Sequence, residues 1–160
     1  SLNFLHDLLR NNDINNNDVQ KFYTVLVKGE WRLGEMVVDT PLQSKGPDSS
    51  FNDKINARKE ALTIFRPIQN FKNFTLLNAE IKTGRTHQIR RHAAHIKFPV
   101  VGDSKYGDFA FNHECRKMGF KRMFLHASEI SFQLPYIGER IVIQAPMDDE
   151  LKGFLEGLDS

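Results

Sequence analysis

Residues 60–82 read EALTIFRPIQNFKNFTLLNAEIK, and this stretch decides the fold class. β-Branched and aromatic residues are concentrated in residues 60–68 and again in residues 74–82, which predicts two strands. Residues 70–73 between them are rich in asparagine, whose side chain bonds to nearby backbone, so they predict the turn of a hairpin. Neighbouring antiparallel strands, in place of strands alternating with long helices, favour an α+β fold.

The rest of the chain extends this pattern in both directions. Strands are expected in residues 21–28, 123–127, 130–134 and 140–144, with a turn at residues 135–138 and a long loop at residues 41–53. Helical spacing of apolar residues predicts helices in residues 2–10, 86–97, 109–118 and 149–158, the last one capped by Asp148. We therefore expect one domain over residues 1–160, a mostly antiparallel mixed sheet with a few packed helices.

Composition excludes several classes of protein. The chain has 160 residues, 40% of them hydrophobic, which is enough for one buried core. It has no apolar run of the length that a membrane span needs and no signal-peptide pattern, and its single Cys115 cannot form an internal disulfide, so we expect a cytoplasmic protein. Glycine patterns typical of common hydrolases, NTPases and dehydrogenases are missing.

Positive charge is concentrated in one segment. Residues 82–101 hold five lysines or arginines, three histidines and no acidic residue, so a total of +2 leaves −3 for the rest of the chain. A local basic element in a near-neutral chain is typical of a surface that contacts phosphates, although a solvated helix face has the same composition. The glycine-containing turn before the expected helix would also leave backbone N–H groups free for an anion.

The three histidines allow a metal site as well. His92 and His95 are one helical turn apart, but the segment supplies no cysteine or carboxylate to complete a ligand shell. His92 also falls beside the apolar face of the expected helix, which favours a hydrogen-bonded core histidine. We therefore expect no metal.

Several motifs, in order, carry a resemblance to a known family. They are TGRTHQIRRH at residues 83–92, PVVGD at 99–103 and YGD at 106–108, preceded by KFY at 21–23 and EALT at 60–63 and followed by FLHA at 124–127. This arrangement resembles the RluA-type pseudouridine synthases, and residues 109–122 resemble the members that act on large-subunit ribosomal RNA. The resemblance implies a pseudouridine synthase catalytic-domain fold that isomerises uridine in RNA without a cofactor, after the base has been flipped into a pocket.

The resemblance also assigns roles to residues. It makes Tyr23 and Arg90 catalytic, with Tyr23 stacking on the uracil and Arg90 pairing with the family's nucleophilic aspartate, and Leu125 a wall of the uracil pocket. RNA contacts are expected from Lys82, Arg85, Thr86, His87, Gln88, Arg91 and Lys97. Gly102, Asp103, Tyr106 and Gly107 match positions that look structural.

One family motif is missing from the printed sequence. The nucleophile belongs to a His-Arg-Leu-Asp motif expected upstream of Tyr23, and Asp7, Asp13 and Asp18 do not stand in that context. We therefore expect the chain to be the C-terminal majority of a catalytic domain, inactive alone, with Arg90 an unpartnered cation at the floor of the pocket.

Other functions fit parts of the pattern. A noncatalytic RNA-binding module needs only the basic helix, and a pseudouridine synthase acting on transfer RNA needs the same motifs. In either case we expect a monomer. A metal-dependent nuclease would use His87, His92 and His95.

Overall fold

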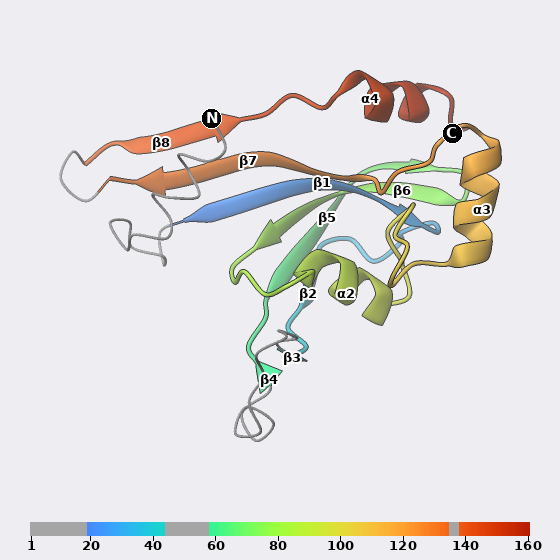
Figure 1. Cartoon of the computed structure of the whole chain (residues 1–160). Helices are drawn as coiled ribbons and strands as arrows, with labels where there is room; N and C mark the ends of the chain where they lie inside the picture. Colours follow the sequence, from blue (N-terminus) through green and yellow to red (C-terminus); the bar gives the residue numbers. More distant parts are fainter. Residues whose placement is uncertain (1–18, 44–57, 135–137) are drawn as a thin grey trace.

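The computed structural model describes residues 19–43, 58–134 and 138–160, and its centre is an antiparallel sheet (Figure 1). Six strands lie in the order β2-β5-β6-β1-β7-β8, and all their pairings are antiparallel. The strands are β1 Gln20–Lys28, β2 Met36–Val38, β5 Thr63–Phe71, β6 Phe74–Ile81, β7 Leu125–Gln133 and β8 Arg140–Gln144. A separate two-stranded sheet pairs β3 Leu42–Gln43, inside the predicted loop at residues 41–53, with β4 Arg58–Lys59, which follows that loop.

The β5–β6 hairpin is confirmed, with a tighter turn than expected. β5 continues through Phe71, so only two residues separate the strands, and Asn73 has the left-handed φ of 67° that asparagine tolerates. The β5–β6 register shifts between Pro67 and Gln69. Proline has no N–H to donate to a ladder, and a bulge is where a strand accommodates it.

β7 corrects a second expectation, because the two strands predicted at residues 123–127 and 130–134 are one continuous strand. The pairing of β7 with β1 shifts by one residue here, so that Phe22 lies opposite Glu129 and Tyr23 opposite Ala127. Ser128 is the extra residue, and its hydroxyl donates to the Phe22 carbonyl over 3.1 Å. A bulge of this kind lets one strand continue past an extra residue.

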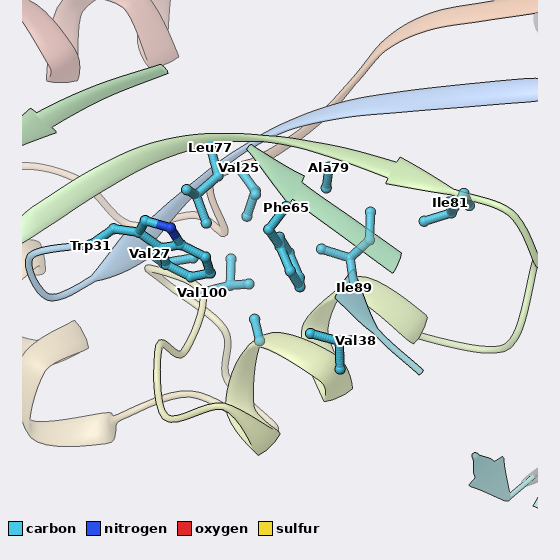
Figure 2. Close-up of a cluster of buried hydrophobic side chains, with 11 residues drawn as sticks. Val25, Val27, Trp31, Val38, Phe65, Leu77, Ala79, Ile81, Ile89 and Val100 are labelled. Carbon is cyan, nitrogen blue, oxygen red and sulfur yellow. The ribbon is translucent and has the colours of Figure 1, made fainter. Parts of the chain in front are cut away.

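Alternate residues of the strands form two separate cores. On one face, Val25, Phe65 and Leu77 pack with α2 (Gln88–His95) through Ile89 and Ala93 (Figure 2). On the other face, Leu26 and Leu76 pack with α3 (Phe109–Lys117) and α4 (Asp149–Glu156) through residues that include Cys115 and Leu151. The period of two in the strands therefore decides which helix covers which face.

The buried Trp31 fixes the loop after β1 to the first core. Its ring lies 5.9 Å from that of Phe65 and 4.8 Å from that of Phe98, measured between centroids. The indole N–H donates to the Gly34 carbonyl over 2.7 Å, so its polar atom is satisfied inside an apolar cluster.

The described helices agree with the sequence, with shorter ends. Asp108 and Asp148 cap α3 and α4 through hydrogen bonds from the N–H groups of Phe111 (3.0 Å) and Leu151 (2.9 Å). α2 begins two residues later than predicted, because His87 is left-handed with a φ of 51°. The helix expected in residues 2–10 and most of the turn at 135–138 lie outside the described residues. Within the described part of the chain, no helix has the length and apolar character needed to cross a bilayer.

Candidate functional site

The turn that enters α2 is organised by the side chain of Gln88. Its Oε1 accepts from the Thr83 hydroxyl over 2.6 Å and from the Arg85 N–H over 3.1 Å, while its Nε2 donates to the Leu62 carbonyl over 2.8 Å. Gln88 is buried, so its expected RNA contact is wrong and its role is structural. The sequence suggested that backbone N–H groups of this turn are free for an anion. The Arg85 N–H is not free, because it donates to Gln88.

Arg90 is held by a buried carboxylate on the loop that follows α2. The Nε of Arg90 donates to Asp103 Oδ2 over 2.9 Å, and its Nη2 donates to Oδ1 over 2.7 Å. The Asp103 side chain is 0% exposed and that of Arg90 is 14% exposed. The expectation that Arg90 is a cation without a partner is therefore wrong, because a loop aspartate 13 residues away supplies one.

Asp103 is ionised at neutral pH despite its burial. Burial alone would raise its pKa, but the hydrogen bonds from Arg90 and from the N–H groups of Tyr106 and Lys105, with the charge of Arg90, outweigh it and hold the pKa below the ordinary value. Asp103 raises the pKa of Arg90 by its hydrogen bond and its charge, against the effect of burial. The pair is therefore a fixed, internally neutral element.

Backbone pairing places this ion pair at the start of β7. The Val101 N–H donates to the Leu26 carbonyl of β1, and the Phe124 N–H donates to the Val101 carbonyl, both over 2.9 Å. Asp103 follows two residues after Val101, and Leu125 follows Phe124 directly. Arg90 is thus brought to the same end of β7 as Leu125.

Tyr23 and Leu125 lie on the face of the sheet that α2 covers. Tyr23 is two residues from Val25, which pairs with Leu125, and both side chains pack at the margin of the core that contains Val25 and Ile89. Burial raises the pKa of Tyr23, so its hydroxyl keeps its proton at neutral pH. The three residues predicted for the uracil pocket therefore gather on one side of the β1–β7 pair.

The expected RNA contacts divide into two groups. Thr86 and His87, just before α2, and Lys97, two residues after it, are exposed. Arg85 and Arg91 are half-buried and donate to the carbonyls of Glu60 (2.7 Å) and Thr86 (3.2 Å). Lys82 pairs instead with Glu80, which alternates with Ala79 and therefore belongs to the opposite face of the sheet. Lys82 is thus separated from the basic surface of α2.

Tyr106 is a site residue that sequence reasoning took for a structural one. Its ring centroid lies 5.2 Å from Arg90 Cζ and 5.4 Å from Lys105 Nζ, and its hydroxyl lies 3.2 Å from His87 Nδ1. Partial desolvation, with the charges of Arg90 and Lys105, lowers the pKa of His87. Tyr106 also lines a shallow groove of about 390 Å³ that continues along α2 to Lys28 and Lys97. The sequence signal was its place at the start of the YGD motif at residues 106–108.

His92 is the buried core histidine that the helix pattern favours. Its Nδ1 lies 2.8 Å from the Thr63 hydroxyl and its Nε2 lies 2.9 Å from the Thr40 carbonyl. Both ring nitrogens are engaged, so His92 is not available to the alternative nuclease site with His87 and His95. Among the residues that the structure describes, no group of three His, Cys, Asp or Glu side chains is placed to hold a metal ion.

Comparison with known proteins supports the resemblance found in the motifs. The model of a family described as RNA pseudouridylate synthase matches residues 5–95. A protein named ribosomal large subunit pseudouridine synthase C from Vibrio parahaemolyticus is 39% identical over 88% of this chain and 44% of its own length. Its namesake from Pasteurella multocida is 37% identical over 99% of this chain and 48% of its own length. The chain thus spans less than half the length of these relatives.

Solved structures agree on the fold. The human RNA pseudouridylate synthase domain containing 4 superposes with a TM-score of 0.70 over 96% of this chain and 66% of its own, at 19% identity. The human domain containing 1 gives a TM-score of 0.66 over 93% and 62%, at 21% identity. The expected α+β fold of this type is confirmed.

Proposed function

Because the chain belongs to the RNA pseudouridylate synthase family, we propose that it forms part of an enzyme that isomerises uridine to pseudouridine in ribosomal RNA. In this reaction the bond from C1′ to N1 breaks, the uracil turns, and a bond from C1′ to C5 forms. The C5 hydrogen leaves as a proton and N1 gains one. Relatives named for the ribosomal large subunit favour that RNA over transfer RNA.

The grouping of Tyr23, Leu125 and Arg90 beside the β1–β7 pair is the observation that carries this proposal. Tyr23 stacks on the flipped uracil and moves a proton on the ring, and Leu125 forms an apolar wall. Arg90 faces the carboxylate nucleophile, which a part of the protein outside these 160 residues supplies. A neighbouring cation favours the ionised, nucleophilic form of such a carboxylate.

The exposed side of α2, with the residues just before and after this helix, is the proposed RNA surface. Arg85, Thr86, His87, Arg91 and Lys97 contact phosphates that flank the target, and the groove beside Tyr106 extends this surface to Lys28. Such contacts make binding fall with rising salt. In this proposal the protein acts as a monomer in the cytoplasm.

The proposal is tested on the full-length protein that contains this sequence. Large-subunit ribosomal RNA with tritium at uridine C5 releases label into water for each uridine converted, and transfer RNA is a parallel substrate. We expect release from ribosomal RNA, and a loss of about 10²- to 10³-fold for Arg90→Ala, the scale seen when one positioned donor is removed from a site. Tyr23→Ala should lose at least as much.

A matched control is Arg32→Ala, which removes an exposed arginine whose one ion pair among the described residues is with Glu30. Its rate should stay at the wild-type level. Salt-dependent binding without release from either RNA would favour a noncatalytic module, and release from transfer RNA alone would correct the substrate.

A further inference from the structure

The Arg90 guanidinium is engaged along one edge and covered on one face. Its Nε and Nη2 contact the two oxygens of Asp103, which is the bidentate geometry that fixes a guanidinium in a plane. The ring of Tyr106 lies over the guanidinium, with 5.2 Å between Cζ and the centroid. Within the described part of the chain, the Nη1 end makes no hydrogen bond.

Asp103 is itself held before any ligand arrives. Its Oδ1 accepts from the N–H groups of Lys105 (2.9 Å) and Tyr106 (3.0 Å), so the carboxylate closes its own turn. Its carbonyl accepts from Nδ2 of the buried Asn112 over 2.9 Å, and Oδ1 of Asn112 accepts from the Gly102 N–H over 2.8 Å. The loop is thus tied to α3 on both sides of Asp103.

A role in stability alone accounts poorly for this arrangement. Removing two charges from water costs about as much as a buried pair gains, so such pairs contribute little net stability. The pair is also neutral as a unit, so it adds little to nonspecific attraction of RNA. Its specific property is a set of N–H donors, at the Nη1 end, pointing in a fixed direction.

We propose that Asp103 is a positioning residue for the isomerisation, holding Arg90 by its Nε–Nη2 edge so that the Nη1 end faces the reacting carboxylate. The inference rests on the proposed function and deepens it. Asp103 does not touch the substrate. It acts through Arg90, so its loss should slow the chemical step and leave RNA binding intact.

The experiment compares Asp103→Asn, Asp103→Glu and Glu80→Gln in the full-length protein. Glu80→Gln is the matched control, because Glu80 is also a buried carboxylate paired with an arginine, Arg66, but on the opposite face of the sheet. Single-turnover tritium release gives the rate, filter binding gives the Kd for RNA, and circular dichroism gives the folded fraction to which both are scaled.

We expect Asp103→Asn to lower the single-turnover rate about 100-fold, the scale of a misplaced reacting group. The amide NH₂ cannot accept from the Arg90 fork, while the RNA Kd should stay within about threefold or tighten, since the site gains a positive charge. Asp103→Glu keeps an acceptor and should recover about tenfold of the rate, because charge-assisted bonds to the guanidinium are restored. It should stay about tenfold below the wild type, because the longer side chain shifts the guanidinium. Glu80→Gln should turn over at the wild-type rate.

Three results overturn the inference while the wild type is active. These are a wild-type rate for Asp103→Asn, equal losses for Asp103→Asn and Glu80→Gln, and a loss confined to the RNA Kd. If Asp103→Asn does not fold, the test rests on Asp103→Glu. A single-turnover rate for Asp103→Glu equal to that of the wild type would show that the exact position of the carboxylate beside Arg90 does not matter, and would refute the inference. An inactive wild type refutes the proposed function itself.

Discussion

Gly102 is the position where one methyl group should do the most damage to the site. It has a φ of +80°, and a Cβ built there would lie 2.0 Å from the Arg122 carbonyl oxygen and 2.9 Å from Met123 Cα. These neighbours are backbone atoms of the segment leading into β7, so no side-chain rotation relieves the contact. Both the backbone angle and the close approach therefore require glycine.

The destabilisation expected for Gly102→Ala follows from three contributions. A left-handed conformation costs an alanine about 1–2 kcal/mol, and forcing extra volume into a packed region costs about 1–3 kcal/mol. Alanine also lowers the conformational entropy of the unfolded chain, which offsets about 0.4–1 kcal/mol of this loss. The unfolding free energy should fall by about 2–4 kcal/mol.

Gly119→Ala separates the cost of the left-handed backbone from the cost of the steric collision. Gly119 has a φ of +94° with nothing within 4 Å of its built Cβ, so it keeps the backbone strain and lacks the collision. Urea unfolding followed by circular dichroism should show Gly102→Ala to be the less stable variant by about 1–3 kcal/mol. Equal losses in the two variants would refute the close approach of residue 102 to the chain before β7.

Three further predictions concern other parts of the molecule. Gly153→Ala, in the interior of α4 with open space around its Cβ, should raise the unfolding free energy by about 0.5–1 kcal/mol, and a lower urea midpoint would contradict this. Burial raises the pKa of the Cys115 thiol to about 11, so a disulfide reagent at neutral pH should label it only after unfolding, and rapid labelling of the native protein would be the contrary result. The lowered pKa of Asp103 stabilises the fold above its ordinary value of 3.8, and this stabilisation is lost as pH falls through the lower folded value. Urea unfolding between pH 5 and about pH 2 should therefore show a steeper loss in the wild type than in Asp103→Asn.

The sequence correctly predicted those elements that depend on residues close together in the chain. The β5–β6 hairpin, the Asp148 cap and the strand Arg140–Gln144 all depend on neighbouring residues, and all are present. The three-residue strand β2 was missed, because its pairing with β5 comes from distant parts of the chain.

The errors at the site have one physical origin. The resemblance assigned Gln88 an RNA contact, and Arg90 was expected to be unpaired because the family's aspartate motif is missing from the printed sequence. Neither argument could take account of partners from distant segments. These partners, Leu62 and Asp103, come from other segments that tertiary packing brings to the helix. The pairing between Arg90 and Asp103 depends on how the loop after α2 folds back, which the motifs do not show.

Trp31 gives one core of the molecule an optical signal of its own. It is the single tryptophan of the chain, and it is buried against Phe65 and Phe98 on the α2 face, whereas α4 packs on the other side of the sheet. Its fluorescence therefore reports the environment of the candidate pocket side, and circular dichroism reports the whole backbone. Unfolding curves from the two signals superimpose only if both cores melt as a single cooperative unit.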